Sequence, residues 1–180
     1  MILRIVLLMC IFVLSNAKLF SQKILVNGKE SNGKLSWTDF IGDPDQKKSF
    51  NAFTAYTFRT KFGSVNFFGD SAVVNNFEVI LELDSKNTWA KKDRVTDLLL
   101  VHEQGHFNLG ILSSKEILAK FKATKFTKQN YNSLLQSIIN DVSKKYRDLG
   151  IKYDDETKHS ENREQQLKWN SFITEELAKY

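Results

Sequence analysis

The sequence has little cysteine and little proline. Its 180 residues include one cysteine, Cys10, and one proline. A chain with a single cysteine cannot close an internal disulfide, so its stability depends on a hydrophobic core, with a bound metal as a further possible support. One proline and eight glycines also exclude a linker-like or low-complexity chain.

A basic tract is absent as well. The net charge of +5 comes from lysines scattered along the chain, whereas nucleic-acid-binding proteins concentrate lysine and arginine in patches or stripes. Hydrophobic residues make up 42% and charged residues 26%, which is typical of globular domains. We therefore expect one globular domain with a substantial core and no nucleic-acid partner.

The N-terminal residues have the features of a secretory signal peptide. Arg4 precedes the apolar run 5–14, and the small residues Ser15 and Ala17 stand where a signal peptidase cuts. The run is about ten residues long, short of the roughly 20 that a membrane-spanning helix needs. An uncleaved N-terminal anchor is the alternative interpretation.

A second possible cleavage position follows Ser21. We assign residues 1–22 to the signal peptide and residues 23–180 to a single domain. Cys10 lies in the predicted leader without the small residues that precede a lipidated cysteine, so a lipoprotein is not expected. The mature protein is predicted to be secreted or periplasmic, without stable membrane association.

From about residue 23 to 91 the pattern favours strands and turns. Two Asn-Gly pairs, at 27–28 and 32–33, are typical of tight turns. Residues 55–62 and 76–84 alternate apolar and polar side chains, which predicts half-buried and antiparallel strands. Residues 76–84 could also form an edge strand that aligns an extended peptide substrate.

From about residue 93 the periodicity becomes helical. Residues 96–121 predict a long helix that carries positions 102–106, and residues 128–149 predict a second helix that Gly150 ends. A third helix is expected from about Ser160. Strands followed by about three helices predict an α+β fold.

The stretch VHEQGHF contains two of the three histidines in the chain, His102 and His106. Residues four apart on a helix share one face, so both imidazoles could bind one Zn²⁺. Glu103 would lie beside the metal as a general base for its bound water. Gly105, in an otherwise strong helix, indicates a close approach at this position.

A catalytic zinc ion needs a third protein ligand. His159, the remaining histidine, lies between the second and third predicted helices and is our candidate. Asp154 is the competing candidate. Alternatively, either Asp154 or Asp155 accepts a hydrogen bond from a ligand imidazole or caps the last helix. Tyr153 is predicted either to stabilise an oxyanion or to pack in the core.

One other zinc-protease pattern is excluded, and a second is disfavoured. The extended HExxHxxGxxH motif fails at Leu109 and Leu112, and no methionine follows the helix. A glutamate ligand on the next helix also lacks a candidate, because residues 128–149 contain Asp141 but no glutamate. The site is therefore not of the metzincin type, and the thermolysin-like arrangement is disfavoured.

The sequence resembles a bacterial family described as predicted secreted zinc-dependent proteases, the domain of unknown function 922 family. The resemblance rests on LLVHEQGHFNL (99–109) and YDDETKHS (153–160), followed by Gln166 and Trp169. It implies a zincin-like fold with zinc bound by His102 and His106 and catalysis by Glu103. It also supports a functional role for His159.

We thus expect a secreted zinc metallopeptidase that hydrolyses peptide bonds in a peptide or protein substrate. Zn²⁺ would be bound by His102, His106 and His159, and Glu103 would act as the base. Two alternatives are a secreted binding protein with a structural or degenerate metal site, and a zinc hydrolase that acts on a non-peptide amide.

Overall fold

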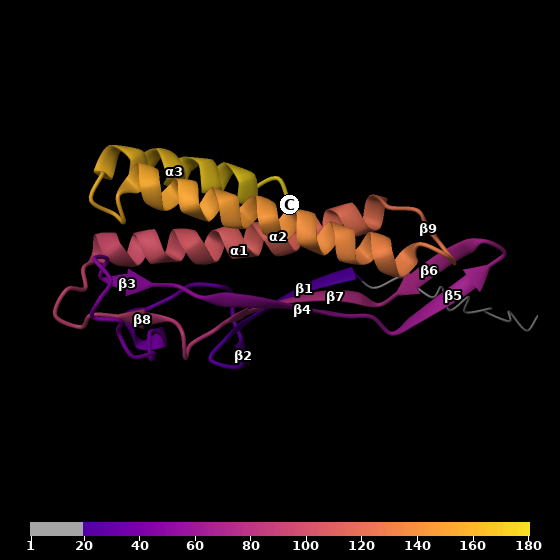
Figure 1. The fold of residues 1–180 in the computed structure, drawn as a ribbon, viewed down its shortest axis with the longest axis horizontal. Coiled ribbons are helices and arrows are strands. Elements are labelled where there is room, and N and C mark those ends of the chain that lie inside the picture. Colours follow the sequence, from indigo (N-terminus) through magenta and orange to yellow (C-terminus); the bar gives the residue numbers. More distant parts are fainter. Residues whose placement is uncertain (1–19) are drawn as a thin grey trace, which may run out of the picture.

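The computed structural model describes residues 20–180, which form a layer of strands covered on one face by three helices (Figure 1). The strands are β1 (Phe20–Val26), β2 (Lys29–Glu30), β3 (Ala52–Phe53), β4 (Tyr56–Lys61), β5 (Ser64–Phe68), β6 (Ser71–Asn75), β7 (Phe77–Leu83), β8 (Trp89–Ala90) and β9 (Phe126–Thr127). The helices are α1 (Asp97–Ala123), α2 (Tyr131–Thr157) and α3 (Arg163–Leu177). This confirms the α+β class, with several antiparallel strand pairs and three helices.

The main sheet has the strand order β2-β1-β7-β4. β4 and β7 are antiparallel, as expected, whereas β1 and β7 are parallel. Asn27 and Gly28 form the turn of the β1–β2 hairpin, and both have positive φ angles, of 53° and 74°. Such angles match the twist that a two-residue hairpin turn requires.

The expectation that residues 76–84 form an edge strand is wrong. β7 lies between β1 and β4, and both neighbours pair with its backbone. A strand paired on both sides offers no free N–H or C=O groups to a peptide. Its burial agrees, since five of its seven residues are fully buried.

The predicted signal peptide lies almost wholly outside the described residues. β1 begins at Phe20, which pairs with Phe77 and whose ring lies 5.8 Å from that of Phe121. Residues 20–22, which we assigned to the leader, thus belong to a sheet strand. In the described part of the chain no helix has the length and apolar character needed to cross a membrane.

Helix α1 lies between the sheet and the other two helices. Thr96 caps its start, with its side chain accepting a hydrogen bond of 3.1 Å from the Leu99 backbone N–H. Buried residues occur all round the helix, as expected for one covered on opposite sides. Side chains near its N-terminal end can therefore face both the strands and α2.

Helix α2 does not end at Gly150, as we expected, but continues to Thr157. Tyr146, Tyr153 and Thr157 are buried, so the helical face that packs against α1 extends past the glycine. A glycine inside a helix costs about 1 kcal/mol relative to alanine, which this additional packing offsets. The two extra turns place Tyr153 and Asp154 beside α1.

Candidate metal centre

His102 and His106 lie one turn apart on α1, and His159 lies in the turn that follows α2. α2 runs back along α1, so its C-terminal end lies beside the first half of α1 (Figure 1). This antiparallel packing brings the third histidine to the first two, across more than fifty positions of sequence.

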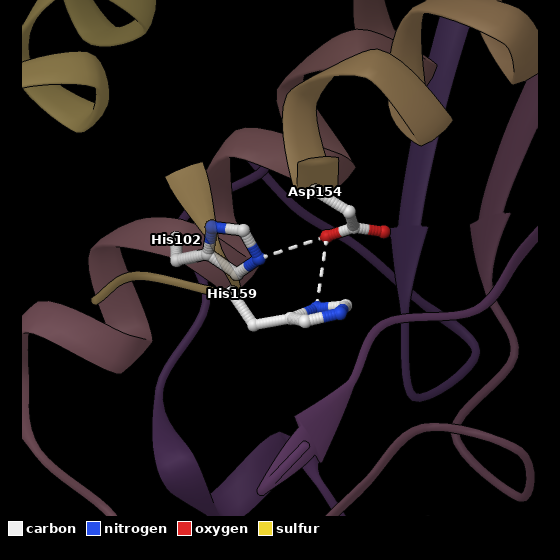
Figure 2. A group of neighbouring side chains, drawn as sticks. All are labelled: His102, Asp154 and His159. Atoms are coloured by element: carbon white, nitrogen blue, oxygen red, sulfur yellow. Dashed lines mark hydrogen bonds and ion pairs between the residues drawn. The ribbon is translucent and has the colours of Figure 1, made fainter. Parts of the chain in front are cut away.

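Asp154 connects the three histidines. Its Oδ1 lies 3.1 Å from His102 Nε2, 2.8 Å from His106 Nε2 and 3.2 Å from His159 Nδ1. Figure 2 shows this oxygen between the imidazoles of His102 and His159. A carboxylate oxygen has about two lone pairs. Oδ1 therefore cannot accept a good hydrogen bond from all three imidazoles at once.

Three of these residues could hold a metal ion. The ligand atoms of His102, Asp154 and His159 all lie within 4.8 Å of one another. In a tetrahedral site with bonds of about 2.0–2.1 Å, neighbouring ligand atoms are ~3.3 Å apart. The separations of 3.1 and 3.2 Å between Asp154 and these two histidines are close to this value.

The hydrogen bonds of His102 show which of its nitrogens is available. Its Nδ1 lies 3.1 Å from Gln166 Oε1 and 3.4 Å from Thr157 Oγ1, two acceptors that fix the proton on Nδ1. A neutral His102 then turns the lone pair of Nε2 toward the Asp154 carboxylate. Two acceptors 3.1 Å apart repel each other unless a proton or a metal ion lies between them, so a metal ion could take the place of the proton in this contact.

The orientation of Gln166 is itself determined by its neighbours. Its Nε2 donates to the Tyr153 hydroxyl at 2.6 Å and to Asn170 Oδ1 at 2.9 Å, which leaves Oε1 for His102. Tyr153 in turn donates to the backbone carbonyl of His102 at 3.0 Å. This closed set of hydrogen bonds links α1, α2 and α3 behind the histidines.

Charge within the cluster shifts two pKa values. Burial raises the pKa of Asp154, but hydrogen bonds from His102 and His106 and the charges of nearby histidines outweigh it, so the pKa lies well below its usual range. Burial lowers the pKa of His106, but the hydrogen bond to Asp154 and the charges of Glu103 and Asp154 raise it above the ordinary value. Asp154 is therefore a carboxylate at neutral pH, as a metal ligand must be.

Glu103 lies next to the histidines but bonds elsewhere. Its side chain is buried, with 3% of the residue exposed, and Oε2 accepts a hydrogen bond of 2.6 Å from Thr54 Oγ1. In residues 20–180 it forms no ion pair with lysine or arginine. Burying a carboxylate without a lysine or arginine partner costs free energy, and such groups occur most often at functional sites.

His159 is held by an unusual backbone and by an aromatic ring. Lys158, His159 and Ser160 have successive φ angles of 48°, 49° and 82°, in the left-handed region that non-glycine residues rarely adopt. The His159 imidazole stacks on Phe50, with ring centroids 5.0 Å apart, and Phe50 stacks on Trp89. An open cavity of about 370 Å³ lies at this point, lined by residues 49–51, 154, 155, 158, 159 and 161.

The structure brings His102, His106, His159 and Asp154 together. Tyr153 is fully buried, with its hydroxyl bonded to His102 and Gln166; its role at an oxyanion stays a prediction. Asp154 and Asp155 do not cap the last helix, because Asn162 does so, accepting from Gln165 N–H at 3.2 Å. Sequence reasoning missed Thr54, because a lone threonine that follows a short strand gives no signal in the sequence.

The fold and the site define an α+β protein with a histidine–aspartate cluster that could hold a metal ion. The model of the family described as "Bacterial protein of unknown function (DUF922)" matches residues 38–160, well over half of the 180 residues. The chain belongs to this family, which confirms the resemblance seen in the sequence. The description names no activity, and no curated protein or solved structure matches the chain.

Proposed function

We propose that the protein is a zinc-dependent hydrolase that cleaves peptide bonds. The observation that carries this proposal is the buried carboxylate of Glu103, which lies beside the histidine cluster and, within residues 20–180, forms no ion pair with lysine or arginine. A metal site that only stabilised a fold would gain nothing from an extra buried charge next to its ligands. A hydrolytic site needs such a group as its base.

The donor set suits zinc. Imidazole nitrogens and a carboxylate oxygen are common Zn²⁺ ligands, and His102, Asp154 and His159 would hold the ion, with His106 adjoining the same aspartate oxygen. When bound, zinc would polarise a substrate carbonyl and lower the pKa of a bound water to about 7. Gln166 would keep Nε2 of His102 free for the metal.

Glu103 is the proposed base. Its carboxylate would take a proton from the attacking water and later deliver it to the nitrogen of the departing amine. Its Oε2 is held by Thr54, which leaves Oε1 to receive the proton. The signal-peptide features of residues 1–22 would place this activity outside the cytoplasm.

The test is Glu103→Gln in zinc-loaded protein, assayed with quenched fluorescent casein. We expect turnover to fall by about 10²–10⁴-fold, the usual contribution of a general base, while zinc content stays near that of the unchanged chain. Glu164→Gln is the matched control, because this carboxylate is fully exposed on α3 and pairs with Lys168. Full turnover by the Glu103→Gln protein would overturn the proposed mechanism.

A second function has one observation in its favour. His106 Nε2 lies 2.8 Å from the same Asp154 oxygen that His102 and His159 contact, so it could become a fourth ligand, and a metal site closed by four protein ligands is structural. The protein would then be a binding protein stabilised by its metal. X-ray absorption spectroscopy of the zinc-loaded protein distinguishes the two, since three protein ligands plus a water favour the hydrolase.

A further inference from the structure

Thr54 follows β3 and touches Glu103 from the sheet side. Its Oγ1 lies 2.6 Å from Glu103 Oε2 and 3.4 Å from the Glu103 backbone carbonyl. Both residues are buried, with 6% and 3% of their surface exposed. The single hydroxyl proton therefore goes to the nearer, charged oxygen, which forms the stronger bond.

Glu103 depends on this hydroxyl. Within residues 20–180, Thr54 supplies the hydrogen bond recorded for the Glu103 carboxylate, and it is made to Oε2. Oε1 has no hydrogen bond there, and it is not among the enclosed unbonded atoms of the described chain. One oxygen of the carboxylate is thus anchored, while the other is left open.

The backbone around Thr54 is fixed on both sides. β3 pairs with β8 through Ala52 with Ala90 and Phe53 with Trp89. On the other side, the Ala55 N–H donates to Thr88 Oγ1 at 3.0 Å, and this hydroxyl donates back to the Ala55 carbonyl at 3.2 Å. A side chain on so restrained a segment can hold a partner in one orientation.

We infer that Thr54 is a positioning residue for Glu103, anchoring Oε2 so that Oε1 faces the water that is to be deprotonated. This inference rests on the proposed function. Thr54 touches no reacting atom; it sets the direction of the carboxylate that does. Because proton transfer requires hydrogen-bond geometry, a carboxylate that rotates away from the cluster loses rate rather than substrate affinity.

The first test compares Thr54→Val, which keeps the shape and removes the donor, with Thr54→Ser, which keeps the donor. With casein as substrate, Thr54→Val should lower kcat by about 10–100-fold, with KM and zinc content unchanged. Thr54→Ser should stay within a few-fold of the unchanged protein. Thr57→Val, an exposed position on β4, is the control and should have full activity.

A thermal double-mutant cycle in zinc-free protein separates this inference from the proposed function. Thr54→Val should lower the Tm by about 3–10 °C, the loss expected for a bond to a buried charge in a chain of this size. In a Glu103→Met background the same change should have little effect. Equal losses in both backgrounds, or a Thr54→Val protein with full kcat, would overturn the positioning role. If instead the cycle shows coupling and the unchanged zinc-loaded protein leaves casein intact, it is the peptidase proposal that fails.

Discussion

The backbone of Gly105 lies against the ring of Tyr153 where α1 crosses α2. A Cβ placed on Gly105 would lie 2.7 Å from Cζ of Tyr153 and closer still to its hydroxyl oxygen. The ring is also fixed, because its hydroxyl donates to the His102 carbonyl and accepts from Gln166. Glycine at this position lets the two helices approach closely enough for Asp154 to reach the histidines.

Gly105→Ala should therefore destabilise the protein. The added methyl group meets a fully buried ring that has no free direction in which to move, so we expect a loss of about 1–3 kcal/mol in the free energy of unfolding. Urea denaturation of metal-free protein measures it. Unchanged stability would mean that α1 and α2 can separate at this point at little cost.

Gly150→Ala is expected to have the opposite effect and to increase the free energy of unfolding. The nearest atom to a Cβ at this position is Nδ1 of His106, at 3.9 Å, an ordinary contact distance. Gly150 lies inside α2, where alanine is favoured over glycine by about 1 kcal/mol. The same denaturation experiment should therefore show a gain, and a loss would contradict the helical assignment at 150.

These two glycines show what the sequence could predict and what it could not. The periodicity of apolar residues predicted three helices and the strand region, because burial leaves a pattern in sequence. The end of α2 was placed wrongly at Gly150, since the packing of Tyr153 and Thr157 against α1 is a tertiary effect that no local signal contains. The parallel pairing of β1 with β7 could not be predicted either, because it also depends on tertiary contacts.

Of the candidate site, too, the sequence predicted some residues and not others. His102 and His106 were found because helical spacing alone places them on one face. His159 was found because histidines are rare in this chain. Asp154 was considered, but its contact with all three imidazoles depends on the register of α2 against α1. Thr54 is brought to Glu103 by the pairing of β3 with β8. Strands of two residues are too short to leave a recognisable pattern in the sequence.

Asp154→Asn should lower zinc affinity more than 100-fold if Asp154 is a ligand. Its Oδ1 faces the nitrogens that His102 and His159 would offer to the metal, so the amide removes a charge at the ion itself. His159→Ala should have a similarly severe effect. Competition with a fluorescent chelator measures both.

Asp155→Asn is the control for this measurement, because Asp155 is exposed and adjoins the site only through the open cavity. A loss limited to about 10–100-fold in Asp154→Asn would indicate that Asp154 acts by hydrogen bonding to ligand imidazoles. Full zinc retention in His159→Ala would remove that histidine from the ligand set.

Metal-free protein should be most stable in mildly acidic solution. The pKa of Asp154 is depressed in the folded state, so its contribution is present above the unfolded value of about 4 and is lost as pH falls further. The pKa of His106 is raised, so its contribution is complete below about 6.5 and is lost as pH rises through the folded value. Tm measured from pH 3 to 9 should peak between these limits.

Zinc should change this profile, because binding requires deprotonated imidazoles. The Tm of zinc-loaded protein should exceed that of metal-free protein at pH 7–8 and converge with it below about pH 5. Asp154→Asn should flatten the metal-free profile. A zinc effect that is independent of pH would argue against ligation by histidine.

Lys158→Gly should stabilise the protein without loss of the metal site. Lys158 ends α2 with a φ of 48° and a ψ of 51°, and its side chain is exposed. The left-handed conformation costs a non-glycine residue about 1–2 kcal/mol, part of which the greater freedom of an unfolded glycine offsets, so we expect a net gain of about 0.5–1 kcal/mol. Arg147→Gly, at an exposed position inside the same helix, should instead lose about 1 kcal/mol. A Lys158→Gly protein that is more stable but binds zinc more weakly would show that the strained turn helps to hold His159 in place. Unchanged zinc affinity would show that the turn only ends the helix.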